Sequence, residues 1–173
     1  MNSLVARVIF ATAVMIGAMV FLTTSSIRTV GAVGDDMAIV TNDISVKMRH
    51  AINFRGSVHD RAILIRDVVL ATSASDQQAS LAEIDRLRAF YNESAGPMAD
   101  LFADAVPETP DEITLMAAIE EVQARTIPIV NEIIGLVEGG DVIAAEAMLM
   151  EQARPAFIDW LAAINAFLDY QEV

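Results

Sequence analysis

The sequence predicts an all-α protein, an up-down-up-down antiparallel four-helix bundle whose first helix extends from an N-terminal transmembrane helix. Three observations lead to this prediction. An uncharged apolar run lies near the N-terminus, apolar residues then recur at steps of three and four, and no alternating strand pattern with Asn-Gly or Asp-Gly turns occurs. The chain is 54% hydrophobic and 20% charged with a mean hydropathy of +0.46, which a membrane segment explains.

The apolar run near the N-terminus has the length of a membrane span. Val8–Leu22 carries no charge, and flanking residues extend the run to about 20 residues, enough to cross a hydrocarbon core of about 30 Å. We therefore expect residues 1–24 to form a transmembrane helix in contact with membrane lipid. A cleaved signal peptide is the alternative, but the helical pattern continues past the membrane edge. Arg7 and the terminal amine favour a cytoplasmic N-terminus.

The first helix of the bundle is expected over residues 25–72, about 70 Å of helix. Its apolar residues step by three and four over many turns, which is the heptad pattern of a coiled-coil seam. Arg55 fills the gap in this pattern between Ala51 and Val58. The seam residues are Val30, Val33, Met37, Val40, Ile44, Met48, Ala51, Val58, Ala62, Ile65 and Val69.

Three further helices are expected over residues 80–105, 110–138 and 141–172. Short connections between long amphipathic helices place them antiparallel, so we expect residues 25–173 to form one helical domain. The boundary signals are a capping box at Ser80–Glu83, an N-cap and first-turn proline at Thr109–Pro110, a stop at Gly139–Gly140 and an N-cap at Asp141. In the last helix, Pro155 cannot donate an amide hydrogen bond to Glu151, which predicts a kink there. Trp160 is expected in the core.

Composition and motifs argue against several classes of function. The net charge of −13 disfavours nucleic acid as a partner, and the chain has no Cys for disulfides or thiolate sites. Neither a Ser-His-Asp arrangement, a phosphate-binding Gly-rich loop nor a His-Glu-x-x-His motif occurs. His50 and His59 are too far apart on one helix to share a metal unaided. We therefore expect no enzyme activity, no metal and no cofactor.

Three cationic residues of the first helix, Arg55, His59 and Arg66, are the candidate ligand-binding residues. At about 100° per residue, Arg66 lies about 20° and His59 about 40° from Arg55, within the apolar sector of the helix. The neighbouring charged residues are expected to face solvent. They are Asp60, Arg61 and Asp67.

Two interpretations of these cations remain open. Arg55 and Arg66 can pair with acids of the later helices, or set the register of a dimer seam, because buried charges are normally paired. The acids in question are Glu120, Asp159 and Asp169. Alternatively, the arginines bind an anionic group, most simply a carboxylate, through the guanidinium fork, and His59 makes the site respond to pH.

Two passages carry a resemblance to a known family. They are Ala51-Ile52-Asn53-Phe54-Arg55-Gly56-Ser57-Val58-His59-Asp60-Arg61-Ala62-Ile63, and Arg154-Pro155-Ala156-Phe157 followed by Trp160 to Glu172. With the anchor and the long first helix, they resemble the N-terminal sensor module of bacterial methyl-accepting chemotaxis proteins. The resemblance implies an inner-membrane receptor with a periplasmic sensor domain that forms a homodimer through helix one. It also implies a small anionic ligand or a periplasmic binding protein as partner.

The expected function is therefore ligand sensing in chemotaxis, with a helix shift transmitted across the membrane to a cytoplasmic signalling domain. That domain and a second membrane span are expected beyond Val173, where the chain looks cut. The alternative is a membrane-anchored helical dimerisation or assembly protein that has no ligand of its own. In that case the seam cations only fix the register of the dimer.

Overall fold

The computed structural model describes residues 10, 14–25, 44–103 and 109–172. The chain divides into two compact units, Met1–Ile44 and Ser45–Val173, which are described separately.

In the first unit, residues 14–25 are helical and their side chains are exposed. Among the described residues, no helix is both long and apolar enough to span a membrane. The other parts of the predicted transmembrane segment, residues 1–9 and 11–13, lie outside the described residues. Residues 26–43 also lie outside them, and with them the predicted seam positions Val30, Val33, Met37 and Val40.

The second unit is all-α. Within residues 45–103 and 109–172 it holds five α-helices and one π-helical segment. The α-helices are α2 (Ser45–Leu70), α3 (Ala74–Ala103), α4 (Pro110–Glu138), α5 (Val142–Met148) and α6 (Arg154–Gln171), and the π-helical segment is η2 (Leu149–Ala153). Because α5, η2 and α6 follow one another without a loop, they form one continuous helical stretch.

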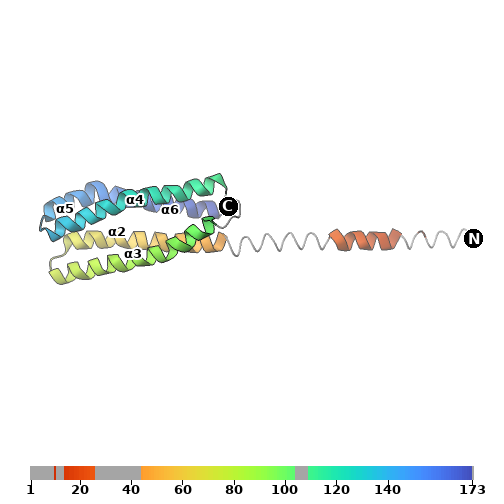
Figure 1. Cartoon of the computed structure of the whole chain (residues 1–173), viewed down its shortest axis with the longest axis horizontal. Coiled ribbons are helices and arrows are strands. Elements are labelled where there is room, and N and C mark those ends of the chain that lie inside the picture. Colours follow the sequence, from red (N-terminus) through yellow and green to blue (C-terminus); the bar gives the residue numbers. More distant parts are fainter. Residues whose placement is uncertain (1–9, 11–13, 26–43, 104–108, 173) are drawn as a thin grey trace, which may run out of the picture. The chain divides into compact units, whose positions relative to one another are not determined.

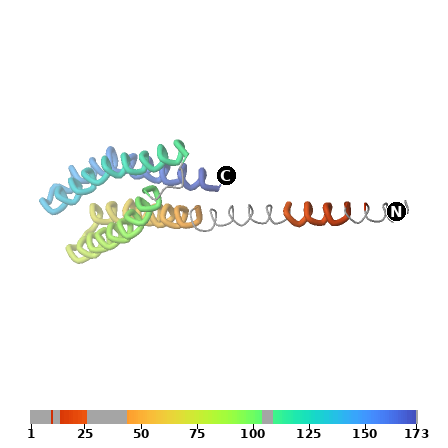
Figure 2. Tube along the Cα trace, turned by 45° about the vertical axis from the view of Figure 1, so that its right-hand side comes forward, coloured from red at the N-terminus to blue at the C-terminus, as the bar shows by residue number. Residues whose placement is uncertain are grey.

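The helices of this unit pack as antiparallel neighbours (Figure 1). α2 packs along α3, while α4 packs along α5, η2 and α6, and contacts of α2 with α4 and α6 join the two pairs (Figure 2). The start of α2 and the end of α6 lie at one end of the bundle (Figure 1). The α2–α3 and α4–α5 turns lie at the other end (Figure 1).

α3 begins earlier than the sequence predicts, at Ala74 and not at Ser80. Ser73 is its N-cap, because the Ser73 hydroxyl accepts a hydrogen bond from the Asp76 amide at 3.1 Å and donates one to the Asp76 carboxylate at 2.7 Å. The predicted capping box at Ser80–Glu83 lies inside the helix. Residues 74–76 thus belong to the first turn of α3.

The ends of α4 coincide with the predicted range. The Thr109 hydroxyl accepts from the Glu112 amide at 3.2 Å, and Pro110 occupies the first turn. At the C-terminal end Gly140 has a φ of 82°, a left-handed conformation that glycine adopts without steric cost. The Asp141 carboxylate then accepts from the Ala144 amide at 3.1 Å and caps α5.

The buried face of α2 is rotated from the predicted seam. Arg55, His59 and Arg66 are exposed, and the prediction that Arg61 faces solvent is wrong, because Arg61 is only 7% exposed. At about 100° per residue the buried face is centred about 90° from Arg55. The apolar side chain of Phe54, which the predicted seam omits, belongs to this face. The buried residues of α2 are Lys47, Ala51, Phe54, Ser57, Val58, Arg61, Ile65, Val68 and Val69.

Aromatic side chains from three helices form the centre of the core. Phe54 of α2 stacks on Tyr91 of α3 with 4.3 Å between ring centroids, and Tyr91 meets the edge of Trp160 of α6 at 5.6 Å. Trp160 also stacks with Phe157 at 6.2 Å. Trp160 is 1% exposed, which confirms its predicted place in the core. These contacts fix α2, α3 and α6 against one another.

Candidate functional site

An open groove lies between α2 and the η2–α6 stretch. It has a volume of about 390 Å³, within the range typical of small-molecule sites. Apolar side chains line most of it, and Arg66 and Arg154 are its charged residues. We refer to it as the arginine groove, and its lining residues are Ala62, Ile65, Arg66, Leu149, Met150, Arg154, Phe157, Ile158 and Leu161.

The π-helix forms one wall of the groove. Pro155 has no amide hydrogen, so the carbonyl of Glu151 cannot receive the usual α-helical bond from it. The Arg154 amide donates instead to the Leu149 carbonyl, five residues back, which is the π-helical pattern. The sequence predicts a kink at this proline, and the observed response is a π-helix. Short π-helical segments within helices are frequently found at functional sites.

The two arginines of the groove are available to an anion. Arg66 Nη2 lies 3.5 Å from Asp67 Oδ1, but the two side chains are 57% and 46% exposed, so this pair contributes little stability. Arg154 is exposed and forms no ion pair with a described residue. Two guanidinium groups beside an apolar surface suit a carboxylate attached to an apolar body.

The structure separates the three predicted site residues. Arg66 lines the groove, whereas Arg55 and His59 lie on the exposed face of α2. Arg55 precedes Arg66 by 11 residues, or about 16 Å along the helix, so one small ligand cannot contact both. The predicted pairing of Arg55 or Arg66 with Asp159 is also not observed, because Asp159 accepts a hydrogen bond from Arg125 at 2.6 Å.

Arg154 and Arg61 are the residues that sequence reasoning did not assign to a site. Arg154 was marked only by its position before Pro155. Arg61 occupies the 3-4 spacing that runs from Lys47 through Ala51, Phe54 and Val58 to Ile65. This spacing could have indicated that Arg61 is buried. It places two cations, Lys47 and Arg61, in the core, although Lys and Arg usually lie at the surface.

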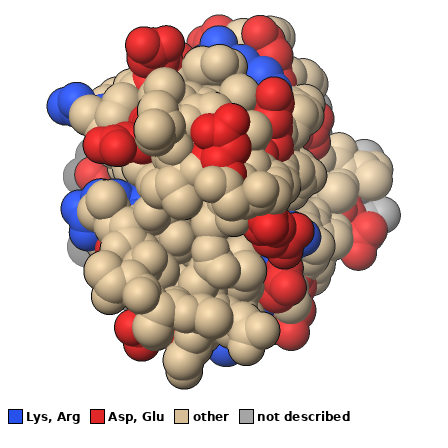
Figure 3. All heavy atoms as spheres, turned by 90° about the vertical axis from the view of Figure 1, so that its left-hand side faces the viewer, with Lys and Arg blue, Asp and Glu red and all other residues tan. Residues whose placement is uncertain are grey.

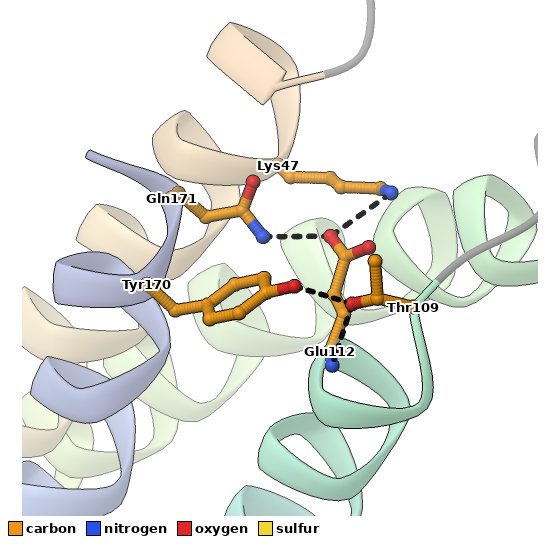
Figure 4. Close-up of polar contacts among 5 residues, drawn as sticks. All are labelled: Lys47, Thr109, Glu112, Tyr170 and Gln171. Atoms are coloured by element: carbon orange, nitrogen blue, oxygen red, sulfur yellow. Dashed lines mark hydrogen bonds and ion pairs between the residues drawn. The ribbon is translucent and has the colours of Figure 1, made fainter. Parts of the chain in front are cut away.

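A polar cluster ties together three helices at the end of the bundle where α2 begins (Figure 4). Glu112 of α4 accepts from Lys47 Nζ at 3.1 Å and from Gln171 Nε2 at 2.6 Å, both at its Oε1 atom. Thr109 and Tyr170 add a short hydroxyl–hydroxyl hydrogen bond between α4 and α6. We refer to these five residues as the clasp. The clasp holds the end of α6 against the starts of α2 and α4.

The chain is acidic overall. The chain has 24 Asp and Glu against 11 Lys and Arg, and acidic side chains are spread over the end of the bundle that carries the two turns (Figure 3). An anion therefore meets general repulsion and needs local cations to bind. Arg66 and Arg154 are such cations.

No protein-family model matches this chain, and no curated protein matches it at a significant level. These comparisons identify no family for the chain.

Proposed function

We propose that this chain is the ligand-sensing domain of a bacterial membrane receptor, and that it binds a small carboxylate with an apolar body in the arginine groove. The single observation on which this proposal rests is that Arg66 and Arg154 line a mostly apolar groove with a volume of about 390 Å³. The guanidinium groups suit the carboxylate, and the apolar lining suits a short aliphatic chain or one aromatic ring.

The position of the groove supports a signalling role. A ligand there contacts α2 and the start of α6 together, and α6 extends about 25 Å from Arg154 to the clasp residue Gln171. A ligand that binds better to one axial position of α6 than to another shifts α6 toward the favoured position. That shift arrives at the end of the bundle where α2 begins.

We propose a four-helix topology and a membrane anchor for this receptor domain. α5, η2 and α6 act as one fourth helix, so the domain is an up-down-up-down four-helix bundle. Residues 1–24 anchor it in the inner membrane with the N-terminus in the cytoplasm, and the bundle lies in the periplasm. The likeness of the two quoted passages to chemotaxis receptor sensor modules and the apolar composition of residues 8–22 support this placement.

Replacing either groove arginine by glutamine is expected to weaken carboxylate binding by about tenfold or more, because a charge-assisted hydrogen bond is lost. The probes are sodium hexanoate and sodium phenylacetate, and binding to the full chain is measured by calorimetry and by the rise in Tm. Arg66→Gln and Arg154→Gln are compared with Arg86→Gln, an exposed arginine of α3 that pairs with Glu83 away from the groove.

Hexanol and 2-phenylethanol carry the same apolar groups without the charge. If the alcohols bind as tightly as the acids, or if Arg86→Gln weakens binding as much as the groove variants, the proposed site is wrong. If none of the acids binds, the ligand class is wrong.

A second candidate function, helical assembly without a ligand, is favoured by the exposed face of α2. Ile52 and Ile63 are 47% and 38% exposed there, beside Arg55 and His59. An added Cβ at Gly56, on the same face, meets no atom within 4 Å, so a second helix can approach closely. Such a strip of apolar and small residues suits the seam of a homodimer.

Ile63→Asp is expected to convert a dimer of the full chain to monomer, because it places a charge in the apolar strip. Sedimentation velocity over a range of protein concentrations measures this. Asp60→Asn, an exposed position on the same helix outside the strip, is the control. A protein that is monomeric at all concentrations before any substitution rules out the assembly function.

A further inference from the structure

We propose that Arg61 binds a small monovalent anion, of the size of chloride or formate, at the bottom of a narrow cleft between α3 and α4. The site is separate from the arginine groove and does not rest on the proposed function. Arg61 comes from α2, Trp160 from α6, Arg88 from α3 and Asn131 from α4, so four helices contribute to one cleft.

Arg61 is a buried cation whose hydrogen-bonding groups are only partly satisfied. Arg61 is 7% exposed, and no described acid forms an ion pair with it. Its Nε donates to the Ser57 carbonyl at 3.3 Å, while its Nη2 has no hydrogen-bond partner among the described residues. Burial lowers the pKa of Arg61 to about 10, so the side chain is still charged at neutral pH. Buried charges in proteins are normally paired, and this one is not.

Two aromatic rings fix the orientation of the Arg61 guanidinium group. The guanidinium carbon lies 4.9 Å from the ring centroid of Trp160 and 5.2 Å from that of Tyr91. Cation–π contacts use the faces of a guanidinium group, whereas hydrogen bonds leave from its edges. The rings therefore hold the cation in place without satisfying its N–H groups.

The cleft is lined by cationic side chains and hydrogen-bond donors. Arg88 lines the cleft and also pairs with Asp85 on the surface of α3 at 3.3 Å. Burial has the largest effect on the pKa of Arg61 and lowers it, Tyr91 raises it, and repulsion by Arg88 lowers it by a smaller amount. The indole N–H of Trp160 makes no hydrogen bond of standard geometry with a described residue. It does interact with the Tyr91 hydroxyl: burial raises the pKa of Tyr91, and Trp160 lowers it by a smaller amount. Asn131 at the opening carries an amide that can donate. Two cations and these N–H donors around one space suit an anion, which relieves the repulsion between the arginines.

The volume of the cleft limits the size of the ion that can bind there. Its volume is about 10 Å³, roughly the room of one water molecule. Chloride, a single atom, is closer to this size than formate, which has three heavy atoms, whereas the apolar carboxylates proposed for the arginine groove require much more space. α3 packs chiefly on α2, and α4 packs chiefly on α6. Because α3 and α4 do not pack closely against each other, there is room for the cleft between them.

The test uses the fluorescence of Trp160, the only tryptophan of the chain. The full chain is titrated with sodium bromide at constant ionic strength, with gluconate as the bulky replacement ion. Bromide quenches indole fluorescence on contact, and a tryptophan that is 1% exposed is protected from random collisions. We expect saturable quenching that chloride and formate reverse by competition. At ten times the dissociation constant, chloride should raise Tm by about 3–6 °C relative to gluconate.

Arg61→Met is expected to weaken bromide binding by about tenfold or more. Arg88→Met, at a half-buried residue on the surface of α3, is expected to weaken it several-fold and is the variant least disturbing to folding. Arg86→Met, on the exposed side of the same helix, is the matched control and should leave binding unchanged.

The chloride and formate titrations distinguish a spherical ion from a planar carboxylate by which competes at lower concentration. Quenching of the unaltered chain that rises linearly with bromide, together with equal Tm values in chloride, formate and gluconate, overturns the proposal. In that case Arg61 is a buried cation stabilised by its aromatic neighbours alone. This outcome leaves the arginine groove untouched, because the groove is tested with different probes.

Discussion

Glu112→Ala is expected to lower the free energy of unfolding by about 3–5 kcal/mol, the cost of breaking a buried ion pair by removing one partner. The Lys47 side chain is 2% exposed and that of Glu112 is 10% exposed, so the pair is nearly dry. The substitution removes the carboxylate that lies 3.1 Å from the buried Lys47 ammonium group. It also removes the acceptor of the Gln171 amide at 2.6 Å. Urea unfolding of the full chain measures the effect.

The control for this prediction is an ion pair of the same chemistry at the surface. Glu83 and Arg86 of α3 are joined by two hydrogen bonds, but their side chains are 42% and 62% exposed. Glu83→Ala is therefore expected to lower the free energy of unfolding far less than Glu112→Ala. A second control is the double variant Lys47→Met with Glu112→Leu, which should recover most of the stability by replacing the charges with apolar groups. A loss below about 1 kcal/mol for Glu112→Ala contradicts the importance given to the clasp.

The helical architecture could be predicted from the sequence because its signals are local. Thr109, Pro110 and Asp141 act through the backbone groups of the next turn, and the structure uses each of them in the predicted way. The start of α3 was missed because two serines offer competing caps. Ser73 and Ser80 look alike in the sequence, and which one begins the helix depends on how α3 packs along α2.

The site could be predicted only in part, because the buried face of a helix depends on its neighbours. The predicted and observed faces of α2 have four residues in common, Ala51, Val58, Ile65 and Val69. They differ in which side of this row of residues packs against the other helices. Whether Phe54 or Arg55 faces the core decides which side of α2 is buried. Phe54 packs on Tyr91, a contact between residues 37 positions apart that no local pattern contains. Burial of Arg61 and exposure of Arg55 follow from that contact.

Trp160→Ala is expected to lower the free energy of unfolding by about 3–5 kcal/mol, through lost burial and the cavity left behind. The side chain is 1% exposed and contacts Tyr91, Phe157 and the guanidinium of Arg61. Ile143→Ala is the control within the same continuous helical stretch. Ile143 is 83% exposed, so its removal should change stability by no more than about 0.5 kcal/mol.

A double-mutant cycle separates the packing of Trp160 from its interaction with Arg61. If the ring stabilises the cation, Trp160→Ala should cost about 0.5–2 kcal/mol more in the presence of Arg61 than in an Arg61→Met background. Water entering the new cavity to solvate Arg61 works in the opposite direction, because a cavity beside a charge fills more readily than an apolar one. The cycle is run in gluconate, so that no bound halide adds to the stability of the unaltered chain. A coupling energy near zero there means that the Trp160 ring stabilises Arg61 no better than the water that replaces it.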